Sequence, residues 1–306
     1  CQAVEDSGCV YAYAENYCYF DGHFALRQMV EDGKIGEAVS LEGDFYNDCS
    51  AKWHMLTRGI RNHWRNFVPS TFYCTHSIAP MFYATGLRAT KVNGLEIPRM
   101  DYMAEGGARS GSAAMEVMEL SNGGMARSTH GNLRYPYTTT IRLIGADGSI
   151  ESDSETVKYY RANGSGGFEI TSYKASFVDF PYRNHADCSA IGNGDYSAVG
   201  FFLAKILGDD QWGKYSIDIY QALDMALPGL LAFRSILDGG APYTVPDFRD
   251  PAIREKYRND HYCTDPRTPE LYRLATSKSG TPDVDEAVYE AVQAKFGGVE
   301  LTPGQK

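Results

Sequence analysis

The residues best suited to chemistry in this sequence are Tyr73 and His76, which stand three positions apart beside a short apolar helix predicted over 78–84. This spacing puts a phenol and an imidazole on one face of a helical turn. Together the two groups can hydrogen-bond a hydroxyl and move its proton. Arg65, a little upstream, can hold an oxygen-rich ligand. The pattern predicts a site for a polyhydroxylated substrate such as a sugar, although Tyr-x-x-His alone is also compatible with a structural role.

A second polar pair, Glu15 and Asn16, follows the apolar run 9–14, which is typical of a buried strand. Open α/β sheets place ligand-contacting groups at the carboxyl ends of their strands. We therefore assign Glu15 and Asn16 to the site, with helix capping or an ion pair as the alternative role for Glu15.

The remaining histidines give weaker signals. His54 and His63 lie in the same predicted loop as Arg65, and either could reach the pocket. His185 precedes the glycine cluster 192–194 and is a further substrate-side candidate. We expect His23, His130 and His261 to be ordinary surface or sheet residues. No His, Asp or Glu cluster has metal-ligand spacing, so no metal is expected.

Composition narrows the class of protein. The chain has 306 residues, a formal net charge of −10 and a pI of about 5.2, which argues against a nucleic-acid or anionic-membrane surface. No apolar run is long enough for a transmembrane helix. The seven cysteines contain no C-x-x-C pair and resemble a reduced set of packing residues. A cytoplasmic location is expected.

The beginning of the chain has the pattern of an interrupted domain. No Met opens it, and residues 1–8 have the pattern of the last turns of a helix, with Gly8 as its C-cap. A helix and a strand make half of a βαβ unit. No G-x-G-x-x-G follows a strand anywhere in the chain. We interpret residues 1–19 as the remnant, the last helix and strand, of a dinucleotide-binding domain.

In the rest of the chain, a run of predicted strand hairpins is flanked by predicted helices. This order predicts an α+β domain, a large mostly antiparallel sheet flanked by helices. The segment 49–72 is expected to be a loop, and 249–306 a surface extension with one amphipathic helix over 284–296. The substrate-binding and oligomerisation domain would therefore cover 20–248. Helices are expected at 22–33, 195–207 and 217–237, and strands at 35–45, 90–97, 114–120, 125–131, 138–144, 149–152, 157–161 and 169–173.

Several of these segments together resemble the Gfo/Idh/MocA family of NAD(P)-dependent sugar and cyclitol oxidoreductases. The resemblance rests on Glu15-Asn16 after a strand, on the pattern L-x-x-M-V-x-x-G-x-I-G-E over 26–37, on the strand that ends in Leu41-Glu42-Gly43, and on the segments 192–196 and 239–248. It covers roughly residues 1–250. The fold it implies is the C-terminal domain of that family, with the nucleotide-binding domain largely missing.

Within the family, the chain most resembles the NAD-dependent glycosidases that act on N-acetylgalactosaminides. By this resemblance Glu15, Arg65, Tyr73, His76 and Tyr196 would line the substrate pocket beside the nicotinamide. That branch has a His-Asp pair where this chain has Asn47-Asp48, and Asn cannot act as a general base. We assign Asn47 and Trp64 to the substrate side, and a loop or capping role is the alternative for Asp48.

The resemblance implies hydride transfer between a sugar carbon and NAD or NADP, with His76 as base and Tyr73 as its partner. The cofactor would be bound mainly by the missing domain, with Glu15 and Asn16 at its edge, so the isolated fragment is expected to be inactive. One alternative is a glycoside hydrolase that works by transient oxidation at C3 and elimination. Another is a non-catalytic assembly module. A homo-oligomer through the antiparallel sheet is expected, with candidate interface residues Tyr135, Tyr137, Tyr159 and Tyr160.

Overall fold

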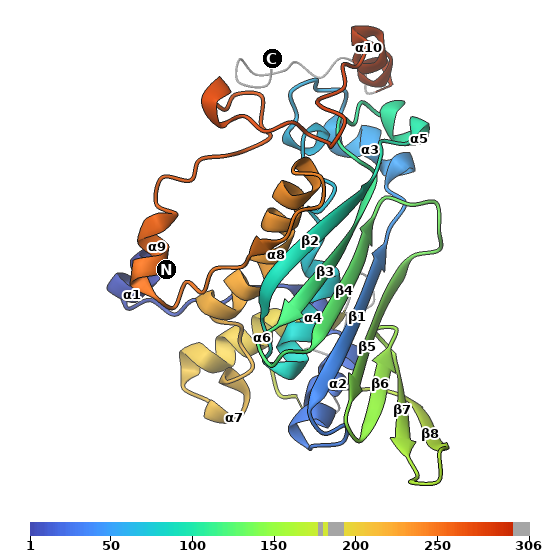
Figure 1. Cartoon of the computed structure of the whole chain (residues 1–306), viewed down its shortest axis with the longest axis vertical. Coiled ribbons are helices and arrows are strands. Elements are labelled where there is room, and N and C mark those ends of the chain that lie inside the picture. The colour runs from blue at the N-terminus through green and yellow to red at the C-terminus, as the bar shows by residue number, and fades with distance from the viewer. Residues whose placement is uncertain (177–179, 183–192, 296–306) are drawn as a thin grey trace.

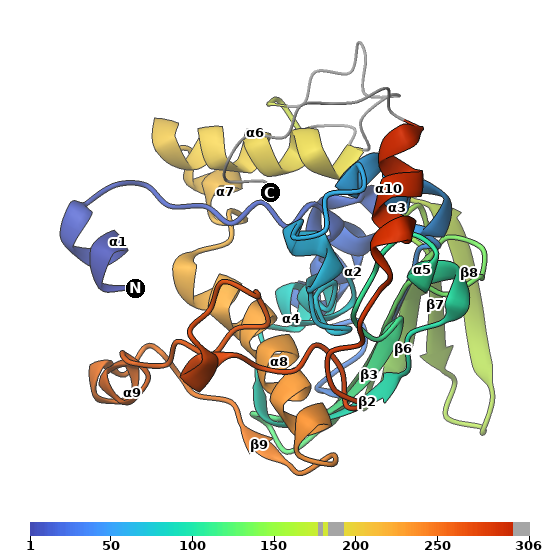
Figure 2. The same cartoon turned by 90° about the horizontal axis from the view of Figure 1, so that it is seen from above.

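A computed structural model of the chain describes residues 1–176, 180–182 and 193–295. Its centre is one large sheet, which Figures 1 and 2 show with helices gathered on one of its faces. All neighbouring strands pair antiparallel except β1 and β4, which are parallel. The expected large, mostly antiparallel sheet flanked by helices is confirmed. In spatial order the strands are β8 (Phe168–Lys174), β7 (Thr156–Ala162), β6 (Gly148–Ser152), β5 (Thr138–Gly145), β1 (Ala38–Tyr46), β4 (Met125–Gly131), β3 (Ala113–Leu120), β2 (Ala89–Ile97) and β9 (Tyr243–Thr244).

Alternation along the strands gives the sheet a buried face. In β1, Leu41 and Phe45 point inward, while the side chains between them are half exposed. Leu41, Ile78 and Leu143 have no exposed surface, so β1, α4 and β5 form the middle of the core. The helices that cover this face are α2 (Asp21–Glu31), α4 (Thr75–Thr85) and α8 (Ile219–Leu237). Helix α6 (Asn193–Leu207) packs on the segment Asn16–Tyr19 instead of on the sheet.

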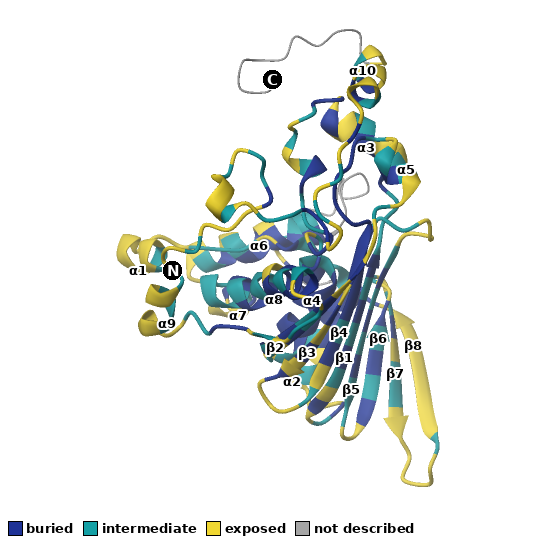
Figure 3. Cartoon of the chain, turned by 45° about the horizontal axis from the view of Figure 1, so that its top comes forward, coloured by how far each residue is buried: buried dark blue, intermediate teal, exposed yellow. Residues whose placement is uncertain are grey.

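The opposite face of the sheet is covered by no described helix (Figures 1 and 2). Leu95 and Met125 are 62% and 63% exposed there, and Arg127 lies among them in ion pairs with Glu42 and Asp44. Figure 3 shows that burial decreases toward β7 and β8 at one edge of the sheet. An apolar face of this kind is compatible with self-association, which stays a prediction that a monomer in sedimentation velocity would contradict.

Short elements surround this centre. Some helix starts have a local cause: Asp218 begins α8 with a capping box completed by Gln221, and Asp285 caps α10. None of the described helices is both long and apolar enough to cross a membrane. The short elements are α1 (Gln2–Ser7), η1 (Asn16–Tyr19), α3 (Ser50–Thr57), η2 (Trp64–Asn66), α5 (Asp101–Ala104), α7 (Asp210–Gly213), α9 (Pro251–Lys256), η3 (Glu270–Tyr272) and α10 (Glu286–Ala294).

Two predicted elements were wrong. The run 9–14 is not a buried strand: its residues are half or fully exposed, and a single bridge joins Tyr13 to Ile217. An apolar run becomes a buried strand only where a sheet edge receives it, and here only one backbone pair does. The segment 49–72 contains α3 and η2, because Trp53 is buried against Met103 and its indole N–H donates to Asn66. The interpretation of residues 1–19 as a domain remnant, and the boundaries at 20–248 and 249–306, stay predictions.

The inner face of the sheet contains a buried acid and a buried imidazole. Glu116 on β3 and His130 on β4 are both fully buried, with 3.5 Å between Oε1 and Nε2. Burial raises the pKa of Glu116 well above its usual range. Burial, and secondarily the charge of His76, lowers the pKa of His130 to about 3. Burial therefore favours the neutral form of both groups. His130 lies in the sheet as expected, on strand β4, whereas His23 is buried on α2 and is neither a surface nor a sheet residue.

Replacing Glu116 by Gln is expected to change the pH dependence of stability. Above the unfolded pKa of about 4.5, the unfolded chain releases the Glu116 proton while the folded chain keeps it, so the native protein loses stability as pH rises. E116Q removes this loss, so its advantage over the parent should grow from pH 4.5 to 8.5 in urea unfolding. Glu119→Gln, an exposed residue of the same strand, should change stability by less than about 0.5 kcal/mol. A constant difference at every pH would contradict the assignment.

Candidate active site

The candidate site lies where η1, the end of β1 and the start of α4 meet. Glu15 is the N-cap of η1, and its carboxylate accepts from the backbone N–H of Tyr17 at 3.4 Å. His76 is in the first turn of α4, and its Nδ1 lies 2.7 Å from Oε1 of Glu15. The Glu15 side chain is only 4% exposed and that of His76 is 22% exposed. Segments 61 residues apart in the sequence therefore form one buried carboxylate–imidazole pair.

Two aromatic rings fix the orientation of the imidazole. The ring of Tyr17 stacks on His76 with centroids 4.0 Å apart, and Phe45 meets it edge-on at 4.8 Å. The hydroxyl of Tyr17 hydrogen-bonds that of Tyr137 at 2.5 Å. Burial and this contact raise the pKa of Tyr17 well above its usual range, so the phenol stays neutral. Tyr137 also contacts the site through this bond, and its expected place in an assembly face stays a prediction.

The Glu15 contact selects the tautomer of His76. A carboxylate can only accept, so Nδ1 carries the proton that it donates to Glu15. Nε2 is then an unprotonated nitrogen that can take a proton from a ligand hydroxyl. When it does so, the imidazolium is paired with a buried carboxylate. This is the arrangement that orients and supports a general base.

Arg65 and Tyr73 form the polar pair beside this base. Nη1 of Arg65 donates to the Tyr73 hydroxyl at 2.7 Å, and the rings of Tyr73 and His76 lie 5.6 Å apart. Because the phenol oxygen accepts from Arg65, its own proton is available for a ligand oxygen. The structure brings Arg65, Tyr73 and His76 together, and their role as site residues stays a prediction.

Close backbone packing holds α4 in this place. A Cβ at Gly43 of β1 would overlap the carbonyl oxygen of Ser77, the residue after His76. The Ser77 hydroxyl hydrogen-bonds Ser128 of β4 at 2.6 Å. On the other side, a Cβ at Gly229 of α8 would overlap the sulfur of Cys74. The position of His76 is thus set by contacts that allow no extra atom.

A cavity of about 380 Å³ opens beside the pair. Glu15, Tyr73 and His76 contribute its polar groups, and Phe72 and Leu230 contribute apolar surface. Burial, with the Glu15 charge second, raises the pKa of Tyr13 in its wall to about 12. The volume is in the range of small-molecule sites. The cavity can therefore place a hydroxylated ring within reach of His76.

Other predicted site residues lie elsewhere. Trp64 is 43% exposed, with the Arg65 guanidinium over its ring at 4.6 Å, and it does not line the cavity. Asn47 and Tyr196 are half-buried and do not line it either. Asn16 does not line the cavity either. Its carbonyl oxygen lies close to the backbone of Gly194. His185 lies outside the described residues.

The weaker alternatives are also resolved. The side chain of His63 caps η2 by accepting from Arg65 N, and neither His54 nor His63 lines the cavity. Asp48 accepts from Ser50 N at 2.9 Å, as expected for a capping residue. The sequence reasoning did not assign Tyr13, Tyr17 or Phe45. The inward alternation of β1 was a usable signal for Phe45, since it places that ring on the face that α4 covers.

The chain resembles known proteins in sequence and in fold. No family model matches the chain. The chain is 23% identical over 280 residues to a glycosyl hydrolase family 109 protein of Streptomyces coelicolor, a match that covers 79% of this chain and 58% of the relative. The chain thus spans little more than half the length of this curated relative.

Solved structures with this architecture include sugar and cyclitol dehydrogenases. A levoglucosan dehydrogenase in complex with NADH and levoglucosan has a TM-score of 0.61 at 19% identity, over 80% of this chain and 69% of that one. An inositol dehydrogenase homologue from Azotobacter vinelandii, complexed with NADH and myo-inositol, has a TM-score of 0.56 at 14% identity, over 79% and 66%. The chain has the fold of the Gfo/Idh/MocA-like oxidoreductases.

Proposed function

We propose that this chain supplies the substrate side of an NAD-dependent oxidoreductase that acts on a hydroxyl of a sugar or cyclitol. The observation that carries the proposal is the buried Glu15–His76 pair, which opens with Tyr73 on a cavity, while Arg65 donates to the Tyr73 hydroxyl from outside the cavity lining. The likeness to the levoglucosan and inositol dehydrogenases supports it. NADP in place of NAD is an alternative that the described residues do not decide.

The residues have separable roles in this proposal. Nε2 of His76 takes the proton of the reacting hydroxyl, while Nδ1–H stays bonded to Glu15. Tyr73 donates to a substrate oxygen, and Arg65 holds the phenol in place. The chemistry that NAD would supply when bound is acceptance of the hydride from the carbon that carries the hydroxyl. Tyr17 and Phe45 keep the imidazole aimed and exclude water from its faces.

The residues of the site fit a nicotinamide ring in part. The cavity of about 380 Å³ beside Glu15 has room for a ring, and Tyr13 offers it a flat wall. We assign Glu15 to the nicotinamide side and retain Asn16 there as a proposal. Binding of the pyrophosphate by a separate nucleotide-binding domain, with a remnant at residues 1–19, is part of the proposal.

Glycoside hydrolysis at the same site is the second candidate, and the relative of glycosyl hydrolase family 109 supports it. Asp48 is engaged in capping and Asn47 cannot act as a base, so this chain lacks the His-Asp pair expected of that branch. Net NADH production separates the two reactions, because an oxidoreductase accumulates NADH while a hydrolase that recycles its cofactor does not. A non-catalytic assembly role predicts neither product.

The test uses the protein expressed from its full gene. Oxidation of myo-inositol, levoglucosan and common hexoses is followed by NADH absorbance, and NADH binding by fluorescence. Arg65→Ala should raise KM by roughly 10- to 100-fold, the loss of a charge-assisted hydrogen bond, and leave NADH affinity unchanged. Arg258→Ala, an exposed control, should behave as the parent. Absence of NADH binding and of turnover would refute the proposal. Tight NADH binding by the 306-residue chain alone would refute the proposal that a separate nucleotide-binding domain binds most of the cofactor.

A further inference from the structure

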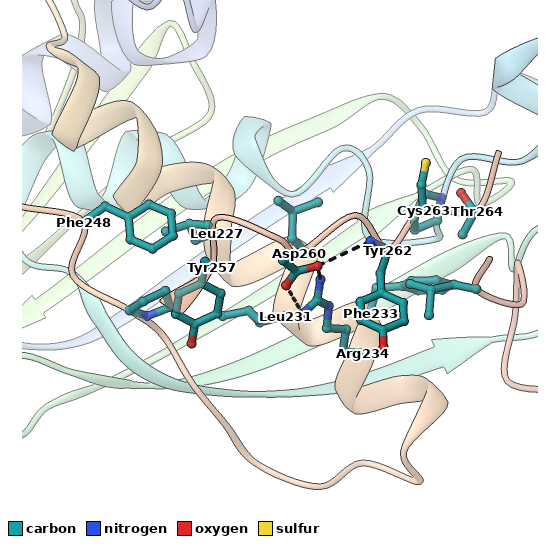
Figure 4. Close-up of a pocket in the computed structure, with 14 residues that line it drawn as sticks. Leu227, Leu231, Phe233, Arg234, Phe248, Tyr257, Asp260, Tyr262, Cys263 and Thr264 are labelled. Carbon is teal, nitrogen blue, oxygen red and sulfur yellow. Dashed lines mark hydrogen bonds and ion pairs between the residues drawn. The ribbon is translucent and has the colours of Figure 1, made fainter. Parts of the chain in front are cut away.

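A second cavity, of about 340 Å³, adjoins the candidate active site. It lies between α8 and the segment 246–274, which returns along that helix (Figure 4). Pro69 and Leu230 line both cavities, so one ridge separates the two spaces. Nothing in the roles assigned to Glu15, Tyr73 and His76 uses this second space.

The walls of this cavity are apolar and aromatic. Leu227 and Leu231 project from α8, and Phe248 meets Tyr257 edge-on with centroids 5.5 Å apart (Figure 4). Tyr262 closes the other end, with the Arg234 guanidinium 5.5 Å from its ring centroid. Surfaces of this kind favour a flat apolar group over a free sugar, whose hydroxyls would lose their water partners here.

The charges in the wall neutralise each other. Arg234 donates through both terminal nitrogens to Asp260, at 2.7 Å each, as the dashed lines in Figure 4 show. Asp260 also accepts from the backbone N–H of Tyr262 at 3.4 Å. A bidentate pair of this kind leaves no free charge aimed at a ligand, which disfavours an anionic occupant such as a phosphate.

We propose that this cavity is a subsite for the apolar substituent of a glycoside, an aryl or short alkyl group, whose sugar ring occupies the cavity beside His76. The inference rests on the proposed function and adds the substrate class: a sugar carrying an apolar group rather than a free sugar. The shared wall of Pro69 and Leu230 places the two parts of one molecule side by side. The subsite adds binding energy away from the reacting carbon.

The test compares 4-nitrophenyl with methyl glycosides of glucose, galactose and N-acetylgalactosamine, measured by calorimetry on the full protein. The 4-nitrophenyl member of at least one pair should bind about tenfold more tightly. Leu227→Trp, which fills the cavity, should remove this preference and leave the methyl glycoside within about twofold. Tyr262→Ala, which removes one wall at a half-exposed position, should reduce it in part. Leu271→Trp is the matched control, because Leu271 is 76% exposed and outside the cavity.

The outcomes separate the two proposals. Equal affinity for both glycosides of every sugar, or a preference that survives in both Leu227→Trp and Tyr262→Ala, overturns the subsite and leaves the proposed function intact. No binding of any glycoside, with either substituent, also overturns the subsite. The proposed function fails by a different result, the absence of NADH binding and of turnover of myo-inositol, levoglucosan and the hexoses. If Leu227→Trp does not fold, as thermal unfolding would reveal, Tyr262→Ala decides alone.

Discussion

His76→Gln is expected to lower kcat by about 10²- to 10⁴-fold in the full protein, because Gln cannot accept the substrate proton through a basic nitrogen. Gln keeps a similar length and can still donate to Glu15, so the fold should survive. Steady-state kinetics at one pH measures this loss.

A control substitution at His261 and a substitution of the partner residue Glu15 make this test more specific. His261→Gln changes an exposed histidine outside the cavity and should leave kcat unchanged. Glu15→Gln should also lower kcat, and the double variant should lose much less than the product of the two single losses, because both residues act on one proton. Retention of kcat within twofold in His76→Gln would exclude His76 as the base.

Gly43→Ala is expected to destabilise the protein by about 1–3 kcal/mol and to lower kcat as well. The added methyl overlaps the carbonyl oxygen of Ser77, which belongs to the backbone and cannot rotate away. Helix α4 must therefore move off β1 and carry His76 with it. A displacement of about 1 Å at a catalytic group can cost on the order of 10²-fold in rate. Urea unfolding and kcat are measured on the same preparation.

Gly167→Ala is the matched control for this substitution. Gly167 precedes β8, and a Cβ there would meet the exposed side chain of Asn163 at 3.0 Å, which can give way by a few tenths of an ångström more easily than backbone can. The control should change neither stability nor rate appreciably. If Gly43→Ala lost stability but kept full kcat, α4 would not be positioned by its contact with β1, and the anchoring role of Ser77 would be wrong.

Local sequence patterns were sufficient to predict most strands of the sheet. The predicted strands from 90–97 to 169–173 all exist within one or two residues of their predicted bounds. The reason is that alternation and hairpin turns such as Asn122-Gly123 act over a few residues. Helix 217–237 begins two residues later than predicted, at Ile219, because Asp218 and Gln221 form the capping box and Ile217 pairs with Tyr13.

Sequence patterns did not predict the secondary structure of segments whose conformation depends on contacts with residues far away in the chain. The run 9–14 has the composition of a buried strand but receives only one backbone pair. The helix at 50–57 has almost no apolar stripe, and Trp53 holds it through contacts with residues that lie elsewhere in the chain. In both segments, contacts with neighbouring residues contribute more to the free energy of folding than the intrinsic secondary-structure preference of the segment does.

The sequence by itself determined the residue types of the site: a phenol and an imidazole one turn apart, an arginine upstream and a carboxylate near the N-terminus. Their spacing also determined that Tyr73 and His76 share a face. Only the tertiary structure decided that Glu15 reaches His76, that Tyr17 and Phe45 hold the ring, and that Trp64, Asn47 and Tyr196 stay outside the cavity. The physical reason is range: helical and strand periodicity act over a few residues, whereas a hydrogen bond across 61 residues depends on how β1, α4 and η1 pack.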